Sequence, residues 1–339
     1  MYSHKKFTLG ESNPTYQLTG SDGSRYVLRK KPPLKLINKK IHWIEREYKI
    51  LHALKNSGVP VPDVYCLSVD ESVIGTPFYI MEFLDGRVSE AWELPGVSPE
   101  DRKDMWMDAT RNLAKLHTLD VRTLDLKNFG QPARFYERQL STITAITEAQ
   151  AQIKDAATQK PIGPIMHSDE LFSFFKTHRK RPREMTTLIH GDFKIDNIVF
   201  HKTEPRVIGF LDWEISSFGH PISDLAHFLT CNVAASVGVI NRRSSLFIVG
   251  VTPGLPSADE VLGWYKEFTG WDPRPDLAWA SAFDMLKLSV ICQGIKARKA
   301  FGQSSTAAEE HIKNGNDIAE TARRLIVQIE KTNKPRLML

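Results

Sequence analysis

The segment over residues 186–213, TTLIHGDFKIDNIVFHKTEPRVIGFLDW, constrains the fold of this chain more than any other. Its first part, residues 188–192, has the pattern of a short buried strand that ends in a sharp turn and presents the Asp192 carboxylate. A His-Gly-Asp turn alone is common, and Asp and Asn side chains near strand ends usually satisfy only backbone groups. Here, however, Lys194 and Asn197 follow Asp192, and a predicted β-hairpin comes next. This spacing favours a catalytic site over a structural turn.

The next two apolar runs predict a β-hairpin. They cover residues 198–200 and 207–211 and are separated by a polar loop. Pairing residue 198 with residue 211 would set Asn197 beside Asp212. An amide carbonyl and a carboxylate are hard oxygen ligands, and Mg²⁺ usually takes one or two such ligands and fills its other positions with water and phosphate oxygens. The hairpin therefore predicts a magnesium site at Asn197 and Asp212, with Asp192 just before it to accept a proton.

Two motifs in this segment match those of protein kinases. Residues 190–197, HGDFKIDN, match the catalytic loop H-R-D-L-x-x-x-N with glycine in place of arginine, and residues 212–214, DWE, stand where D-F-G stands. On these motifs the chain resembles the aminoglycoside phosphotransferase and choline kinase group of small-molecule kinases. HGDFKIDNIVF with LDWEISSFGHPISDLAHF is most similar to the kinase-like domain of acyl-CoA dehydrogenase family members ten and eleven. The resemblance extends from residue 10 to near residue 305.

The resemblance implies a fold class and a domain organisation. It implies an α+β, two-lobed protein-kinase-like fold, with a small antiparallel β-sheet N-lobe and a mostly helical C-lobe. We expect the N-lobe to cover residues 1–85 and to bind the nucleotide. The C-lobe would cover residues 86–339 and carry the catalytic loop, the metal site and the acceptor pocket.

The N-terminal pattern over residues 7–30 predicts a hairpin with a turn at residues 20–23. In a kinase-like N-lobe the earlier turn, residues 10–15, would lie over the ATP phosphates, where Ser12 and Asn13 offer hydroxyl, amide and backbone donors. This turn has one glycine and departs from the glycine-rich loop of protein kinases. An ordinary turn is an equal alternative.

A cation and a carboxylate are predicted to face each other behind that turn. Residues 26–29, YVLR, align with the V-A-I-K strand, which places Arg29 at the position that contacts the α and β phosphates. Lys30 is the alternative, but strand alternation allows only one of the two to point into the cleft. Glu47 lies at the edge of an apolar helical stripe over residues 41–55, and a carboxylate turned toward a core needs a cationic partner. We therefore expect Glu47 to pair with Arg29.

Residues 76–83, TPFYIMEF, have the pattern of a buried strand. In kinase folds this strand leads into the hinge that reads adenine through backbone groups, so Met81, Glu82 and Phe83 are the predicted adenine contacts. A simple core strand is the alternative reading, and the two are compatible.

Composition bounds the class of protein. The chain has 339 residues, 41% of them hydrophobic, and three widely spaced cysteines that suit a reducing compartment and receive no role here. It lacks an 18-residue apolar run and an N-terminal signal core, so we expect a soluble, intracellular and most plausibly cytoplasmic protein, with peroxisome and mitochondrion left open. The net charge of +5 suits anionic small molecules. The basic runs at residues 29–40 and 178–183 lack the interleaved aromatics of a nucleic-acid module, so neither nucleic acid nor membrane is an expected partner.

The predicted reaction is transfer of the γ-phosphoryl group of ATP, with Mg²⁺, to a small-molecule hydroxyl. Asp192 would take the hydroxyl proton and Lys194 would contact the γ-phosphate. The resemblance implies a hydroxyacyl-CoA as one acceptor, with a basic run binding the CoA moiety. The alternatives are an aminoglycoside-type or choline-type alcohol, and a catalytically silent nucleotide-binding scaffold. Neither the acceptor nor the oligomeric state follows from the sequence.

Patterns in the remainder of the chain predict helices and one candidate pocket. Residues 99–117 and 258–330 have helical patterns, residues 142–160 suggest a helix and loop, and a helix start is expected at residues 219–226. Glu214 is either near the metal or a surface acid. Five C-terminal aromatics are candidate acceptor-pocket or core residues, with core as the default: Trp264, Tyr265, Trp271, Trp279 and Phe283.

Overall fold

The computed structural model of the protein describes residues 3–7, 13–31, 44–126, 129–130, 133–177, 181–300 and 308–333. The chain divides into two compact units, each assembled from separate stretches. The first comprises Met1–Gln131, Thr187–Phe218 and Glu267–Gly270, and the second comprises Pro132–Thr186, Gly219–Lys266 and Trp271–Leu339. This division does not test the lobe boundary expected between residues 85 and 86, which stays a prediction.

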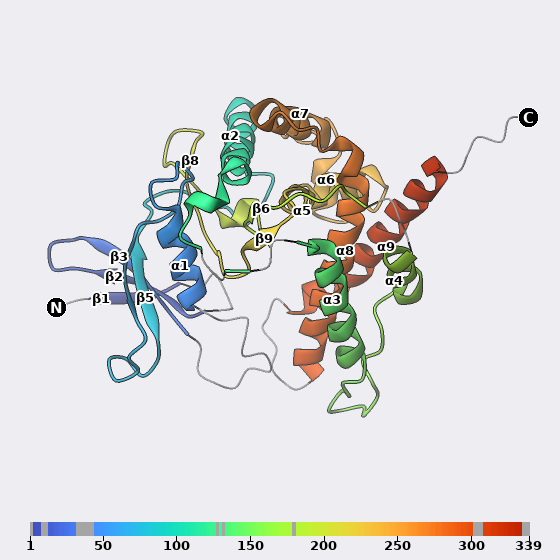
Figure 1. The fold of residues 1–339 in the computed structure, drawn as a ribbon, viewed down its shortest axis with the longest axis horizontal. Helices are drawn as coiled ribbons and strands as arrows, with labels where there is room; N and C mark the ends of the chain where they lie inside the picture. The colour runs from blue at the N-terminus through green and yellow to red at the C-terminus, as the bar shows by residue number, and fades with distance from the viewer. Residues whose placement is uncertain are drawn as a thin grey trace, which may run out of the picture. The chain divides into compact units, whose positions relative to one another are not determined.

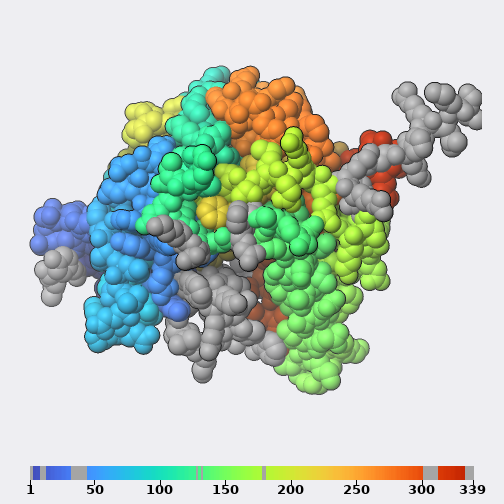
Figure 2. Space-filling model, viewed as in Figure 1, coloured from blue at the N-terminus to red at the C-terminus, as the bar shows by residue number. Residues whose placement is uncertain are grey.

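A five-stranded antiparallel sheet begins the first unit, in the order β1-β2-β3-β5-β4. Its strands lie together in blue in Figure 1, and with α1 they make up most of the blue surface in Figure 2. In β3 the side chains of Val27 and Arg29 are buried on one face, as alternation requires. The strands are β1 (Ser3–Lys6), β2 (Thr15–Thr19), β3 (Arg25–Lys30), β4 (Val64–Ser68) and β5 (Phe78–Glu82).

The hairpin predicted over residues 7–30 is confirmed in its second half. Strands β2 and β3 pair across the expected turn, with Thr19 opposite Arg25. The first strand of this hairpin begins at Thr15 and not at Phe7, and β1 is a separate strand. Pro14 has no N–H to donate to a ladder, so a strand that continues through it is disfavoured.

Two helices of the first unit follow their predicted patterns. Helix α1 (Ile44–Leu54) buries an apolar face that includes Ile44 and Leu51, and Glu47 lies on the same side with 1% of its surface exposed. Residues 41–43, where the helix was expected to start, lie outside the described residues. Helix α2 (Pro99–Thr118) starts as predicted, with proline in its first turn and the Ser98 hydroxyl accepting a hydrogen bond from a backbone N–H.

The segment that follows residue 186 forms the predicted hairpin with a different register. Ile198 lies opposite Phe210, whereas we expected residue 198 opposite residue 211. The pairing also shifts before Phe200, where an extra residue is accommodated in β8 as a bulge. The backbone of Asn197 therefore meets Leu211, whose N–H donates to the Asn197 carbonyl at 2.8 Å. The elements here are β6 (Thr187–Ile189), the 3-10 helix η2 (Ile195–Asn197), β7 (Ile198–Phe200), β8 (Val207–Phe210) and β9 (Ser217–Gly219).

The second unit is mostly helical, which confirms the pattern over residues 258–330. Helices α8 and α9 lie side by side, and α3 packs on α8 (Figure 1). The helix expected within residues 142–160 ends at Ala151, and the one expected from residue 219 begins at Ile222. Its helices, of which α7 ends in the first unit, are α3 (Phe135–Ala151), α4 (Ser168–Thr177), α5 (Ile222–Phe228), α6 (Thr230–Ser236), α7 (Ala258–Thr269), α8 (Arg274–Ala300) and α9 (Ala308–Asn333).

Among the described residues, none of the helices combines the length and the apolar character needed to cross a membrane.

Candidate functional site

Asp192 lies on a tight turn after β6, and Asn197 holds its position. The Asn197 amide donates both to the Asp192 backbone carbonyl at 2.8 Å and to the Asp192 carboxylate at 2.9 Å. Gly191 makes the turn possible, because its φ is +88° and a Cβ there would lie 2.8 Å from the Ile215 carbonyl oxygen. The predicted proton acceptor and one predicted metal ligand are thus neighbours.

A buried histidine connects this turn to the end of β8. The Nε2 atom of His190 lies 2.9 Å from the Leu211 carbonyl, and its Nδ1 accepts a hydrogen bond from the Asp192 backbone N–H at 3.3 Å. Since a carbonyl accepts only, these contacts fit a neutral imidazole protonated at Nε2. The ring also packs on Trp213, with centroids 4.6 Å apart. Asp192 and Asp212 are therefore held by one common support.

Arg29 binds three carboxylates from two other parts of the first unit. It donates to Glu47 at 2.5 Å and to Asp212 at 2.8 Å, and its guanidinium lies 3.5 Å from Glu214. Burial alone would lower the pKa of Arg29, but the charges of Glu47 and Asp212 outweigh it and raise that pKa well above its ordinary value. The predicted Arg29–Glu47 pair is present. Lys30 points to the other sheet face, where its Nζ lies over Tyr16 at 5.5 Å.

Glu214 is mostly buried, so it is not a surface acid, and its side chain contacts the predicted phosphate turn. Its side chain is 12% exposed and accepts a hydrogen bond from the Asn13 amide at 3.1 Å. Asn13 itself is 2% exposed, and among the described residues neither its side-chain Oδ1 nor Nε of Arg29 has a hydrogen-bond partner, although both are buried. Buried polar atoms without partners mark places where water or a ligand completes the structure. Ser12 lies outside the described residues.

Lys194 lies between two carboxylates. Its Nζ is 3.2 Å from Asp192 and 3.5 Å from Asp196, and its side chain is 26% exposed. Asp196 in turn accepts a hydrogen bond from the indole N–H of Trp92 at 3.2 Å. Sequence reasoning missed both Asp196 and Trp92. Position 196 is one residue from Asn197 and could have been singled out, but nothing in the pattern around Trp92 indicated its partner.

Arg46 is a further residue that sequence reasoning missed. Its guanidinium lies 3.7 Å from the ring centre of Phe129 and donates to the backbone carbonyls of Phe129 and Ser216. Burial lowers the pKa of Arg46. The contact anchors α1 to the segment that follows Asp212, so the helix that carries Glu47 is attached to the predicted metal loop at a second point.

The predicted adenine contacts lie at the end of β5. Met81 is buried between Val27 and Val64 of the neighbouring strands, and the Glu82 carboxylate accepts a hydrogen bond from the Asp63 backbone N–H at 3.1 Å. Phe83 follows the strand and stacks on the ring of Phe7, with centroids 6.5 Å apart. The core-strand reading is present, and adenine recognition stays a prediction.

The oxygen atoms needed for Mg²⁺ fit the predicted ligands. The side-chain nitrogen of Asn197 donates to Asp192. The side-chain oxygen of Asn197 is then the atom that would accept a cation. Asp212 uses one carboxylate oxygen for Arg29 and is 29% exposed. It adopts a left-handed backbone, with φ of +66°, which is uncommon outside glycine and clusters at functional sites. In the part of the chain that the structure describes, no group of three or more His, Cys, Asp or Glu could hold a metal, so Mg²⁺ here would rely on water and phosphate oxygens as well.

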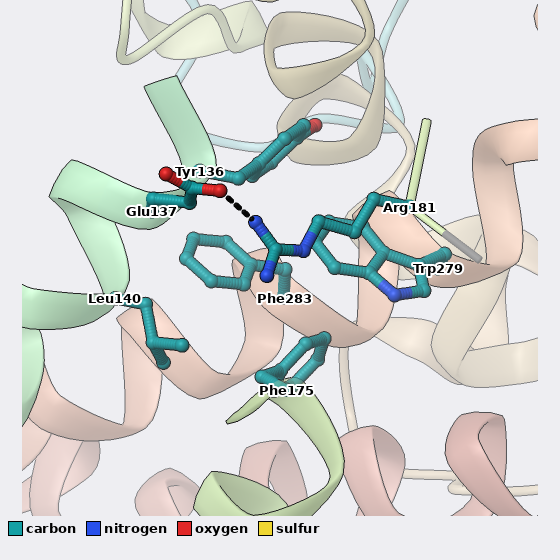
Figure 3. Close-up of a pocket in the computed structure, with 7 residues that line it drawn as sticks. All are labelled: Tyr136, Glu137, Leu140, Phe175, Arg181, Trp279 and Phe283. Carbon is teal, nitrogen blue, oxygen red and sulfur yellow. Dashed lines mark hydrogen bonds and ion pairs between the residues drawn. The ribbon is translucent and has the colours of Figure 1, made fainter. Parts of the chain in front are cut away.

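The second unit contains a small, partly open pocket with a largely aromatic lining. Trp279 and Phe283 stack in its wall, with centroids 5.6 Å apart, and Arg181 lies among the rings and pairs with Glu137 at 2.7 Å (Figure 3). Of the five aromatics predicted as core or acceptor-pocket residues, three are buried, as expected of core residues: Tyr265, Trp279 and Phe283. The other two, Trp264 and Trp271, are partly exposed.

One arginine of each basic run is paired in the part that the structure describes. Arg181 pairs with Glu137, and Arg29 is enclosed by its carboxylates. Residues 178–180 and 32–40 lie outside the described residues.

Comparison with known proteins identifies the family. The model of the phosphotransferase enzyme family matches residues 3–245. This chain belongs to that family. Its membership confirms the predicted class of enzyme, a phosphotransferase that acts on hydroxyl groups of small molecules, and the α+β kinase-like fold.

The phosphotransferase has relatives of two kinds. Acyl-CoA dehydrogenase family member 11 of Rattus norvegicus is 38% identical over 304 residues, which are 89% of this chain and 37% of the relative, so the chain spans little more than a third of that protein. A Ralstonia eutropha crystal structure, provisionally assigned as an aminoglycoside phosphotransferase, is 32% identical with a TM-score of 0.82 and covers 97% of this chain and 93% of its own. The streptomycin-ATP-APH(2'')-IIa complex, 15% identical with a TM-score of 0.56 over 86% of this chain and 84% of its own, shares the fold.

Proposed function

We propose that this phosphotransferase uses Mg²⁺ and ATP to phosphorylate a hydroxyl group of a small molecule. The arrangement of Asp192 supports this most directly. Its carboxylate is fixed by Asn197 and lies beside the Lys194 cation, and the same turn is joined through His190 to the segment that carries Asp212. The side chains proposed as proton acceptor, cation and metal ligands thus belong to one compact unit, which supports the proposal of phosphoryl transfer.

Each of these side chains then has a role. Asn197 and Asp212 would hold Mg²⁺, which neutralises phosphate charge when bound. Arg29, kept in place by Glu47, binds the α and β phosphates with its planar donor fork.

The remaining groups act on the terminal phosphoryl group, the acceptor and the adenine. Lys194 offsets charge on the transferred group, and Asp192 orients the acceptor hydroxyl and takes its proton. Asn13, with Ser12, covers the phosphates, and residues 81–83 contact adenine. The presence of ATP in the related APH(2'')-IIa complex supports ATP as the donor.

A hydroxyacyl-CoA is the acceptor that the relatives' names favour, since family member 11 is described as an acyl-CoA dehydrogenase. The rival acceptor is a polar alcohol of the aminoglycoside type, favoured by the assignment of the Ralstonia eutropha structure. A panel of both kinds, incubated with Mg²⁺ and ATP and assayed for acceptor-dependent ADP release, separates them. If neither class of acceptor causes ADP release, the catalytically silent scaffold is favoured.

Replacing Asp192 with Asn tests the mechanism. The variant keeps the shape and a hydrogen-bonding group but loses the proton acceptor, so turnover should fall by about 10²- to 10⁴-fold while ADP affinity is retained. The control is Asp85→Asn, which removes an exposed carboxylate paired with Arg25 and Lys202. Turnover of Asp192→Asn equal to that of the natural protein would refute the role of Asp192.

A further inference from the structure

Lys194 is shared by two carboxylates, and only one of them belongs to the predicted reaction. Asp192 is the predicted proton acceptor, at 3.2 Å from Nζ, and Asp196 lies on the other side at 3.5 Å. Burial alone would lower the pKa of Lys194, but the two negative charges outweigh it and raise that pKa. The cation is therefore held between the two acids and is not bound to Asp192 alone.

Asp196 has its own support in a distant part of the chain. Its second oxygen accepts the Trp92 indole N–H at 3.2 Å, and Trp92 is 104 residues away, ahead of α2. Burial raises the pKa of Asp196, and Lys194 opposes this. Both oxygens of the partly buried Asp196 carboxylate are therefore engaged, one by an N–H donor and the other by the Lys194 cation.

We propose that Asp196, held by Trp92, is a positioning residue that sets the Lys194 ammonium beside Asp192. A lysine side chain has a flexible four-carbon stem, and a single ion pair at the surface orders it only weakly. A second, anchored carboxylate restricts the ammonium to the space between the acids. Lys194 is then placed for the transferred phosphoryl group before the nucleotide arrives. This purpose depends on the proposed function, but the hold on Lys194 does not.

The first test measures the hold on Lys194 without any turnover. Lysines are acetylated with limiting acetic anhydride at fixed pH, and the rate at Lys194 is read by mass spectrometry relative to Lys202. Asp196→Asn should raise that relative rate by about fivefold, because one charged hydrogen-bonding partner is lost. Trp92→Phe should raise it less, since it removes only the N–H donor. The control Asp85→Asn should change Lys202 and leave the absolute rate at Lys194 unaltered.

The second test measures consequences for the reaction. With the best acceptor from the panel, or with water as acceptor, Asp196→Asn should lower kcat by about tenfold or more and Trp92→Phe by severalfold, with ADP affinity by calorimetry unchanged. In the double variant the loss should equal that of Asp196→Asn alone, because Trp92 acts through Asp196. A residue that only stabilises the fold would instead lower the thermal midpoint and weaken ADP binding.

The outcomes separate the two proposals. An unchanged acetylation rate at Lys194 in Asp196→Asn overturns the positioning role. Effects of Trp92→Phe and Asp196→Asn that multiply in the double variant overturn the part assigned to Trp92. Faster acetylation in a protein that turns over no acceptor and no ATP leaves the hold on Lys194 standing and removes the proposed function.

Discussion

Glu47 is the most deeply buried carboxylate of the candidate site, and Arg29 is its hydrogen-bonded cationic partner. Replacing Arg29 with Met should leave that carboxylate buried without its cationic partner, which costs about 3–5 kcal/mol of unfolding free energy. The double change Arg29→Met with Glu47→Leu should regain most of the stability, because an apolar pair fits a buried site. Urea unfolding measures both variants. A double variant as unstable as the single one would contradict this account.

Neither variant should bind nucleotide normally, whatever its stability. Both lack the guanidinium that Asp212 contacts and that is proposed to bind the phosphates. ADP titration by calorimetry should therefore show at least a tenfold loss of affinity in the stable double variant, on the order of one lost charged contact.

Gly191 is expected to be indispensable for the turn that presents Asp192. An alanine there would need a φ of +88° and would bring its Cβ to 2.8 Å from the Ile215 carbonyl oxygen. We expect Gly191→Ala to cost roughly 1–3 kcal/mol and to displace Asp192, lowering kcat/KM. Gly130→Ala is the matched control, because the nearest atom to its Cβ is 3.9 Å away and its φ is not positive. Equal activity and thermal midpoints for the two alanine variants would contradict the prediction.

The hairpin β7–β8 illustrates which parts of the site the sequence could predict. Apolar runs on either side of a polar loop were sufficient to locate both strands, and the alignment of residues 26–29 with the V-A-I-K strand favoured Arg29, which is the buried one of the pair. The register was wrong by one residue, because continuous apolar runs without alternation do not fix which residues lie opposite each other. The observed register still brings the backbone of Asn197 to Leu211, next to Asp212, and the metal site stays a prediction.

Helices α5 and α8 of the second unit are joined by a buried acid that makes stability depend on pH. Asp284 is 4% exposed and contacts His227 at 3.0 Å and Lys287 at 2.8 Å. Burial would raise the pKa of Asp284, but Lys287 and His227 outweigh it and lower that pKa to about 2. A depressed folded-state pKa stabilises the protein above the unfolded value of 3.8, and that stabilisation is lost as pH falls from 3.8 toward 2.

The size of this effect follows from the shift. It amounts to roughly 2 kcal/mol, at about 1.4 kcal/mol per pKa unit. Asp284→Asn should therefore be destabilising at pH 6, and its deficit relative to the natural protein should shrink by about that amount at pH 2.5, as measured by urea unfolding. Asp276→Asn on the same helix should not show this, because burial raises the pKa of Asp276. A deficit for Asp284→Asn that is the same at both pH values would contradict the assignment.

Contacts across long stretches of sequence hold the candidate site together. Asn13 meets Glu214, Arg29 meets Asp212, and Trp92 meets Asp196, so partners lie 201, 183 and 104 residues apart. A one-dimensional pattern can show that Glu47 needs a cation, because burial of a charge is a local property. It cannot show that Trp92 serves Asp196, because neither residue violates any local rule. The Glu47–Arg29 contact was therefore predictable from the sequence, while the contact of Trp92 with Asp196 was not.

Nucleotide binding should stabilise the whole molecule in a manner that depends on Mg²⁺. Any ligand that binds only the folded state stabilises it, by about 2.7 kcal/mol at a concentration 100 times Kd. Mg²⁺ and ADP together should raise the thermal midpoint by several degrees. EDTA should remove most of the rise, because without the ion the negative ADP phosphates and the Asp212 carboxylate repel each other. Asp212→Asn should show a small shift that EDTA no longer changes. Asp192→Asn should keep the full dependence, because its carboxylate accepts a proton and holds no metal. Calorimetric scans at fixed ADP decide between these roles, and an EDTA-insensitive shift in the natural protein would remove Asn197 and Asp212 as metal ligands.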